Sequence, residues 1–367
     1  MNFVTKHSDI MALIDAVDPV KYGITRNYLD GAVTKLSPYI SRGVISTKQV
    51  AKAILKKGYH PQQILIFLKE LAWRDYFQQT WAELGANINT DVKQAQTKVS
   101  HFAIPQHIID ANTGITAIDN GINSLYQTGY MHNHMRMYVA GLTCNIGQSH
   151  WLHPARWMYY HLLDADWASN ALSWQWVAGS FNNKKYIANQ ENINTYCSTS
   201  QTNTYLDMPY DALEKIAIPE ALVQTTTFNL KTDLPLTPEP KLNNNQPIFI
   251  YNFYNLDSQW NRNIQANRIL LLEPDFFEQY PVSPKTLGFV MALSENIKDI
   301  QVVVGAFDAI FKPEQYHKIH YKEHPTNLHY KGNKHERDWM FGQVKGYHPS
   351  FYAYWKKCEM LFNQLIN

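Results

Sequence analysis

Five polar side chains lie among tryptophan, tyrosine and methionine in one stretch of the sequence, residues 113–176. They are Asn133, Arg136, Asp164, Asp166 and Asn170. A charged group in apolar surroundings must be paired or must bind something, because it loses its hydration. An Arg136–Asp164 ion pair with helix caps would meet that requirement without a ligand. The density of polar groups on faces that should be buried favours a constellation that faces a large, flat ligand.

Turn signals divide this stretch into four predicted helices, in each of which apolar residues recur at helical spacing. Glycine commonly follows the last residue of a helix, so Gly129 and Gly179 are expected to end the first and the fourth. Pro154 suits the first turn of the third helix, and Asp164 or Asp166 is the expected N-cap of the fourth. These helices would position the polar side chains.

The motifs of the stretch carry a family resemblance. TGxxxxDxxxxxLxxTGxMHNxxRM, followed by a tryptophan, LLDxD, xxN and WQW, resembles the flavin-binding core of the photolyase/cryptochrome family. The resemblance covers roughly Tyr22 to Tyr186 and keeps the order of the family's motifs. It implies an all-helical domain that binds FAD. The residues it assigns to FAD binding are Tyr22, Thr34, Lys35, Leu36, Ser37, Arg74, Asn133, Arg136, Asp164, Asp166 and Asn170.

The segment from Tyr22 to Ser46 is dense in glycine, small residues and hydroxyl side chains. Ser37 as N-cap and Pro38 in the first turn predict a helix start, whose free N–H groups would suit a diphosphate. Taken alone, the segment favours an ordinary capped helix. The resemblance implies that residues 34–37 hold the flavin diphosphate.

A long helix is predicted for residues 61–84, with a stripe that begins at Glu70 and Trp73 and continues through Phe77 and Trp81. As an isolated helix it reads as core, with a carboxylate that reaches solvent. The resemblance implies that it faces the substrate. Glu70 would then contact the damaged base pair, Trp73 would pack on it, and Arg74 would approach the cofactor.

The resemblance also implies an electron-transfer chain. Trp174 matches the tryptophan nearest the flavin, and Trp151 matches the middle one. The third is expected near residues 98–102, which read Lys-Val-Ser-His-Phe, so the identity of the surface donor stays open. Asn170 falls where the family places the residue that faces the flavin N5, and a neutral amide there favours the electron-donating form. The implied catalytic residues are Glu70, Asn170, Trp151 and Trp174.

Substrate contacts follow from the same resemblance. Trp176 matches a tryptophan that lines the dimer pocket. The methionine at position 137 resembles the residue found there in enzymes for cyclobutane dimers. His132 and His134 keep the (6-4) lesion open as an alternative. The implied substrate-binding residues are Glu70, Trp73, Met137, Trp176, Lys184 and Lys185. Taken alone, the two lysines favour a solvated charge pair over phosphate contacts.

Contacts to DNA are sparser than in the family. The loop after WQW usually carries an arginine near Asn189, and His134 stands at another position that is usually basic. Fewer phosphate contacts predict weaker duplex binding, so the expected partner is DNA that contains pyrimidine dimers, with single strands favoured.

Composition sets further bounds. The 367 residues are 45% hydrophobic and 17% charged, and the formal net charge is +2, which permits a nucleic-acid partner without requiring one. Three scattered cysteines favour a reducing compartment and exclude a disulfide framework. Cys197 alone fills a ligand position of the family's iron–sulfur members, which predicts no cluster and no metal. Neither a signal peptide nor a membrane span is expected, so a cytoplasmic protein is predicted; the oligomeric state stays open.

The C-terminal third has a different pattern. Residues 223–246 read as a linker, and the short apolar runs after them alternate with helical segments, which predicts a small parallel α/β sheet. The expected organisation is a helical FAD-binding domain over 1–222 and an α/β domain over 247–367. His317, His320 and His324 could share a metal, but the polar surroundings favour surface histidines.

The predicted fold is therefore mainly α, with a small α/β domain after the helical one. The predicted function is light-driven repair of cyclobutane pyrimidine dimers by reduced FAD. The alternative is a cryptochrome-like blue-light photoreceptor that signals through its C-terminal domain. A third possibility is a flavin-binding protein whose second domain has an unrelated role.

Overall fold

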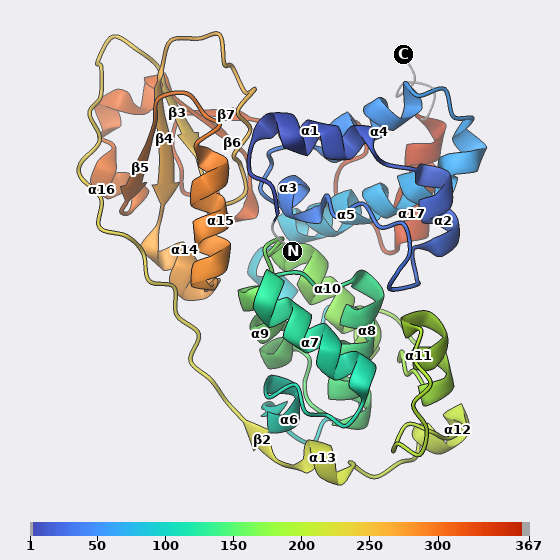
Figure 1. Ribbon diagram of the computed structural model, residues 1–367. Helices are drawn as coiled ribbons and strands as arrows, with labels where there is room; N and C mark the ends of the chain where they lie inside the picture. Colours follow the sequence, from blue (N-terminus) through green and yellow to red (C-terminus); the bar gives the residue numbers. More distant parts are fainter. Residues whose placement is uncertain (1–2, 362–367) are drawn as a thin grey trace. The chain divides into compact units, whose positions relative to one another are not determined.

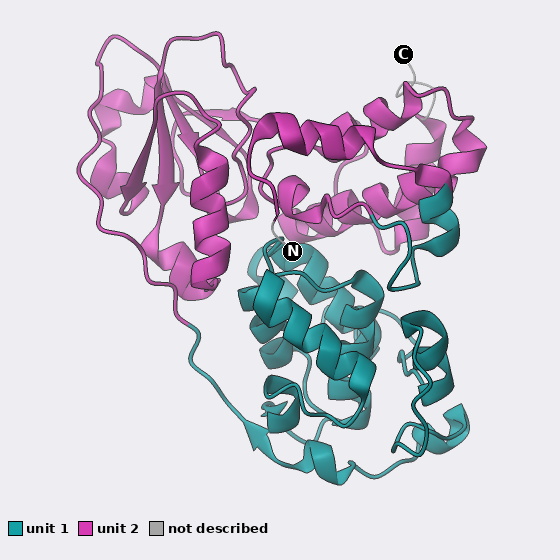
Figure 2. Cartoon of the chain, viewed as in Figure 1, with its two compact units in different colours: residues 1, 21–33, 84–230 teal, residues 2–20, 34–83, 231–367 magenta. Residues whose placement is uncertain are grey.

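The computed structural model describes residues 3–361 and divides them into two compact units (Figure 2). Unit 1 holds residues 21–33 and 84–230, and unit 2 holds residues 3–20, 34–83 and 231–361. The predicted fold class, helices followed by a small α/β part with a parallel sheet, is confirmed. These two units do not correspond to the domains predicted from the sequence, residues 1–222 and 247–367. The predicted domain boundaries stay a prediction. None of the described helices is long and apolar enough to cross a membrane.

Unit 1 is built from short helices (Figure 1). Its elements are α2 (Pro19–Thr25), the 3-10 turn η2 (Gly85–Asn89), β1 (Ile104–Pro105), α6 (Gln106–Ile109), α7 (Thr116–Thr128), α8 (Asn133–Gly141), α9 (Leu152–His161), α10 (Trp167–Ala178), α11 (Gln190–Cys197), α12 (Tyr210–Leu213), α13 (Glu220–Val223) and β2 (Thr225–Thr226). A π-helical turn, Leu142–Ile146, extends α8. Helix α10 packs against both α8 and α9, so these three form the centre of the unit.

The helix boundaries of unit 1 follow the sequence signals. Gly129 and Gly179 end α7 and α10 in the left-handed region, with φ of 72° and 82°, where glycine has no steric cost. Asp166 is the N-cap of α10, and its carboxylate accepts a hydrogen bond from the Ser169 N–H at 3.0 Å. The predicted ends of these helices are therefore confirmed.

Unit 2 combines N-terminal helices with the C-terminal α/β part. Its helical elements are α1 (His7–Asp15), α3 (Ser37–Ser41), α4 (Thr47–Leu55), η1 (Pro61–Ile64), α5 (Leu65–Leu84), α14 (Pro274–Gln279), α15 (Pro284–Ser294), α16 (Phe307–Ile310), η4 (Pro313–Lys318), η5 (Pro325–Asn327) and α17 (Phe351–Met360). The prediction of Ser37 as an N-cap was wrong by one residue. Ser37 begins α3, and Leu36, which has no side-chain acceptor, precedes it.

The sheet of unit 2 has five parallel strands in the order β5-β4-β3-β6-β7. They are β3 (Ile248–Tyr251), β4 (Asn267–Leu272), β5 (Ile300–Val304), β6 (Ile319–Lys322) and β7 (Asn333–His335). Strands β3 and β4 are buried along their whole length. Their sequences are mostly apolar as a result, although β4 begins with the buried polar residues Asn267 and Arg268. The chain adds β4 and β5 on one side of β3 and then crosses to β6 on the other. The order of the sheet therefore reverses between β3 and β6.

Of the three histidines predicted to lie at the surface, His324 is buried. His324 is only 3% exposed, with its ring stacked on Tyr254 at 4.1 Å and edge-on to Trp81 at 5.0 Å between centroids. Pro325 begins a 3-10 turn here, and the His324 ring caps it by accepting from the Thr326 N–H at 3.3 Å. Within residues 3–361, no group of three or more His, Cys, Asp or Glu side chains is arranged to hold a metal ion.

Candidate functional site

The Arg136–Asp164 pair predicted from the sequence is present in unit 1. Two hydrogen bonds run from Arg136 to Asp164, Nη1–Oδ1 at 3.3 Å and Nη2–Oδ2 at 3.0 Å, and Arg136 Nε donates to the Met131 carbonyl at 2.9 Å. The two side chains are 20% and 6% exposed. The Tyr130 ring lies 6.0 Å from the guanidinium, and burial raises the pKa of its phenol to about 12. The pair is thus a bidentate, largely buried charge pair beside an aromatic ring.

The neighbouring polar residues differ in burial. Asp166 is 3% exposed and caps α10, and Asn170 is 7% exposed and donates from Nδ2 to the Ala155 carbonyl at 2.8 Å. Asn133, by contrast, is exposed, so the expectation that it lies on a buried face was wrong. It is the first residue of α8, where His132 is the cap and accepts from the His134 N–H, and its neighbours His134 and Met135 are buried.

Both predicted electron donors are buried in unit 1. Trp151 is fully buried at the N-terminus of α9, and Trp174 is 2% exposed within α10. The position expected for a third tryptophan is taken by a loop in which Phe102 is 71% exposed. Its ring lies 5.0 Å from the His150 ring, next to Trp151 in the chain.

Three of the four residues predicted to bind substrate in unit 1 are half-buried. Trp176 and Met137 are half-buried, and the Trp176 ring packs 6.2 Å from the Tyr186 ring. Lys185 donates from Nζ to the Thr97 carbonyl at 2.7 Å, and burial lowers its pKa, whereas Lys184 is exposed.

His134, one basis for the (6-4) alternative, is bonded at both ring nitrogens. Nδ1 lies 2.8 Å from the Asn27 carbonyl, and Nε2 lies 3.1 Å from the Tyr186 hydroxyl. Burial lowers the pKa of this imidazole. A neutral histidine held at both nitrogens acts as a structural link between α8 and the loop at Asn27.

The segment predicted to hold a diphosphate belongs to unit 2. Lys35 has a φ of 54°, in the left-handed region, and Thr34 Oγ1 accepts from the Leu36 N–H at 3.3 Å. Leu36 is buried, while Thr34, Lys35 and Ser37 are half-buried. The backbone therefore makes a tight turn immediately before α3.

The helix predicted to face substrate, α5, carries an unexpected neighbour in unit 2. The Trp73 ring stacks on the Phe351 ring of α17 with centroids 3.9 Å apart and planes 9° apart. Arg74 donates from Nη2 to Ser41 Oγ at 2.6 Å, and Glu70 is half-buried. The aromatic spacing Phe351, Tyr354, Trp355, preceded by the N-cap residue Ser350, is the signal by which the sequence could have indicated α17.

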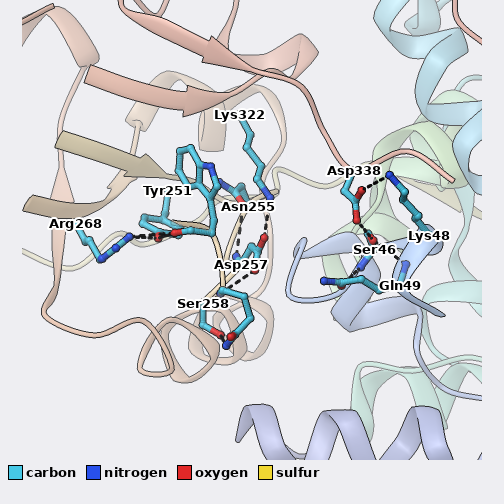
Figure 3. Close-up of polar contacts among 12 residues, drawn as sticks. Ser46, Lys48, Gln49, Tyr251, Asn255, Asp257, Ser258, Arg268, Lys322 and Asp338 are labelled. Atoms are coloured by element: carbon cyan, nitrogen blue, oxygen red, sulfur yellow. Dashed lines mark hydrogen bonds and ion pairs between the residues drawn. The ribbon is translucent and has the colours of Figure 1, made fainter. Parts of the chain in front are cut away.

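Sequence reasoning also missed a polar pocket of about 100 Å³ in unit 2. It lies beside the carboxyl ends of β3 and β6, where the order of the sheet reverses, the usual place for ligands in open α/β sheets. Two ion pairs line it, Lys322–Asp257 at 2.8 Å and Arg337–Glu323 at 2.9 Å. A third lining carboxylate, Asp338, is paired with Lys48 at 3.2 Å (Figure 3 shows the Lys322–Asp257 and Lys48–Asp338 pairs). Its charges are therefore largely balanced within the chain.

Asp75, on the wall of this pocket, predicts a pH dependence of stability. Burial raises the pKa of this carboxyl to about 6, although hydrogen bonds from Met340 N–H and Thr47 oppose the rise. The folded protein thus holds the proton more tightly than the unfolded chain, so its free energy of unfolding falls as pH rises from about 4 to about 6. The full fall is about 3 kcal/mol, from two pKa units.

We expect Asp75→Asn to flatten this fall, measured as the free energy of unfolding in urea at several pH values across that range. Asp338→Asn, which changes a pocket carboxylate that is 39% exposed, is the control and should keep the wild-type slope. Equal slopes for the wild type and Asp75→Asn would contradict the prediction.

Part of the chain is similar to a known protein family and to proteins of other organisms. Residues 67–207 match the family model described as the FAD binding domain of DNA photolyase. A deoxyribodipyrimidine photo-lyase of Agrobacterium fabrum is 32% identical over 179 residues, 46% of this chain and 37% of that protein. A cryptochrome DASH of Natronomonas pharaonis is 29% identical over 183 residues, 45% of this chain and 36% of that protein.

Among solved structures, a bacterial class III photolyase from Agrobacterium tumefaciens aligns with a TM-score of 0.45 and 23% identity. The alignment covers 59% of this chain and 51% of that one. The chain spans about a third of the length of the curated relatives it matches.

Proposed function

We propose that this chain, which belongs to the photolyase/cryptochrome family and takes FAD as its cofactor, is a light-driven lyase that splits cyclobutane pyrimidine dimers in DNA. The observation that carries the proposal is the buried Arg136–Asp164 pair, with Asp166 and Asn170 on the next helix. All four residues lie in the segment that matches the family model.

The polar groups of unit 1 fit the edge of a flavin ring. A guanidinium and two carboxylates supply both donors and acceptors in a buried setting, as a heterocycle with alternating N–H and carbonyl groups requires. FAD supplies light absorption and one-electron transfer when bound. The residues proposed to hold it are Tyr22, Thr34, Lys35, Leu36, Ser37, Arg74, Asn133, Arg136, Asp164, Asp166 and Asn170.

The chain's own residues then set the conditions for repair. Asn170 is a neutral amide, so it presents no acidic proton to the ring. Glu70 is proposed to hydrogen-bond the dimer and to stabilise the charge that develops on it. Met137 and Trp176 are proposed to shape the pocket for the extruded bases, with stacking as the main attraction.

Single-stranded DNA is the proposed preferred substrate. Lys185 is engaged with the Thr97 carbonyl, which leaves Lys184 as the exposed cation of that pair. Each phosphate contact adds to duplex affinity, and flipping a dimer out of a duplex costs a few kcal/mol. With few phosphate contacts, that cost is poorly offset.

A repair assay tests the proposal. Chemically reduced, FAD-loaded protein is mixed with a short oligonucleotide that carries one thymine dimer, single-stranded or duplex, in blue light or in darkness. We expect repair only in light, and faster repair of the single strand. Glu70→Ala should slow repair and leave bound FAD unchanged, whereas Glu83→Ala, at an exposed position of the same helix, should repair like the wild type. Intact dimers after illumination of reduced, FAD-bound protein would overturn the proposal.

One observation favours a second function, a cryptochrome-like blue-light photoreceptor. The face of Trp73, a residue proposed to pack on the lesion, is stacked on Phe351 of α17. A C-terminal helix bound to the proposed substrate helix is suited to signalling, because its release would report a change at α5. A protein that binds FAD, responds to light and repairs neither substrate would select this function.

A further inference from the structure

The indole of Trp151 donates its hydrogen bond to a carboxylate. Nε1 of this fully buried tryptophan lies 2.7 Å from Asp91 Oδ1. The same oxygen lies 3.4 Å from His150 Nε2, and Asp91 Oδ2 accepts from the Gln96 N–H at 2.8 Å. Because three donors converge on Asp91, its carboxylate is fixed in place with one oxygen against the indole N–H.

The other buried indoles of unit 1 have different partners. Trp157 donates to the Tyr126 hydroxyl at 3.1 Å, and Trp167 donates to Asn89 Oδ1 at 2.9 Å. Trp174 Nε1 is buried and has no hydrogen-bond partner among residues 3–361. The two tryptophans proposed as successive electron donors therefore differ in the one feature that governs proton loss, the presence of an acceptor at the indole nitrogen.

This difference determines which of the two tryptophans holds the positive charge after an electron is lost. Removal of one electron from an indole leaves a cation whose N–H is strongly acidic. At Trp174 that proton has no hydrogen-bond acceptor among the described residues, and a buried positive charge is costly. At Trp151 the cation faces a carboxylate at hydrogen-bond distance, which stabilises the charge and can take the proton. Positive charge is thus favoured on Trp151 over Trp174.

The backbone brings the two tryptophans into one framework. The Val92 N–H, next to Asp91, donates to the side chain of Gln175, next to Trp174, at 3.0 Å. Helices α9 and α10, which carry Trp151 and Trp174, pack against each other. Asp91 is therefore held by the same helix pair as both donors.

We propose that Asp91 accepts the indole proton of oxidised Trp151 and so makes Trp151 the terminal electron donor of this chain. The inference rests on the proposed function, because the oxidant is a photoexcited oxidised flavin. Trp174 gives one electron to that oxidant and receives one from Trp151. The Nε1–H bond of Trp151 then breaks, its electron pair stays on nitrogen, and the proton forms an O–H bond on Asp91. A neutral Trp151 radical and a neutral Asp91 carboxylic acid result.

His150 and Phe102 complete the end of the chain. His150 Nδ1 accepts from the Leu152 N–H at 3.4 Å, so the proton of the neutral ring sits on Nε2 and points at Asp91. Beyond His150 stands Phe102, whose ring is much harder to oxidise than an indole. No further donor is needed at residues 98–102, because proton loss retains the oxidised state on Trp151.

The proposal is tested by laser flash absorption on FAD-loaded protein, where neutral and cationic tryptophan radicals have distinct spectra. The wild type should show the neutral radical. Asp91→Asn keeps an acceptor for the indole N–H and removes the base, so it should show the cationic radical. Its lifetime should be at least about tenfold shorter, equivalent to about 1.4 kcal/mol. Asn89→Ala, which removes the partner of Trp167, should behave like the wild type.

Two further readouts keep the outcomes distinct. In NMR spectra of FAD-free protein, the indole N–H resonance of Trp151 should shift from its wild-type position in Asp91→Asn and keep that position in Asn89→Ala. In the wild type, radical deprotonation should be independent of buffer concentration, because the base is internal. A cationic radical in the wild type, buffer-dependent proton loss or an unmoved resonance would each overturn the proposal. FAD-bound wild type that forms no tryptophan radical at all overturns it together with the proposed photochemistry, whereas neutral-radical formation without repair overturns only the lyase function.

Discussion

Replacing Asp164 by alanine is expected to abolish retention of FAD and to lower the free energy of unfolding by about 3 kcal/mol. The substitution leaves the Arg136 guanidinium, only 20% exposed, without the carboxylate that accepts both of its terminal hydrogen bonds. An unpaired guanidinium in this buried position lowers the free energy of unfolding by more than the ion pair itself adds to it. The reason is that folding has already removed water from the guanidinium, and only the carboxylate compensates for that loss. Flavin absorbance after gel filtration and urea denaturation measure the two effects.

An exposed lysine–aspartate pair is the control. Lys231 and Asp233 lie 3.3 Å apart, but their side chains are 81% and 82% exposed. Asp233→Ala should change the free energy of unfolding by less than about 0.5 kcal/mol, because exposed pairs are solvated and screened. If Asp164→Ala keeps its FAD and unfolds like the wild type, the pair is neither buried enough to matter nor part of the cofactor site.

The elements that the sequence predicted are those with local signals. The Arg136–Asp164 pair followed from the rule that charges among aromatic residues need partners, and its two hydrogen bonds are present. The start and the end of α10 were predictable because Asp166 and Gly179 stand directly before and directly after the helix. Continuous apolar runs such as Ile248–Tyr251 indicated buried parallel strands, and the sheet is parallel.

The features that were missed depend on contacts between distant residues. Asp91 lies in a polar loop without periodicity, and its indole partner is 60 residues away in the chain. The stacking of Phe351 on Trp73 likewise joins residues with no local relationship, and the Tyr76 hydroxyl donates to the carbonyl of His348, which is 272 residues away in the chain. Such contacts also draw residues 34–83 into one unit with the C-terminal part. Spacing along a sequence reports periodicity and caps, and it carries no information about which faces meet.

Replacing Trp174 by phenylalanine is expected to slow photoreduction of bound, oxidised FAD by at least about a hundredfold, or about 2.7 kcal/mol in the barrier. Phenylalanine retains an aromatic ring in a well-packed position but is a far poorer electron donor, so the next donor would have to act over a longer distance. Stability should change little, because the indole N–H has no hydrogen-bond partner among the described residues to lose. Bleaching of the oxidised flavin band under blue light with an external reductant measures the rate.

Trp157→Phe separates electron transfer from packing. Trp157 is equally buried, at 2% exposure, and lies in α9 of the same unit, but it does not match a position of the family's electron-transfer chain. Its substitution removes a hydrogen bond to Tyr126, so it should destabilise the protein at least as much as Trp174→Phe while photoreduction stays near the wild-type rate. Equal slowing in both variants would trace the effect to a loosened core. Unchanged photoreduction in Trp174→Phe, with FAD still bound, would mean that electrons enter by a route that bypasses α10, and Trp151 with its Asp91 partner would then need a different neighbour through which to act.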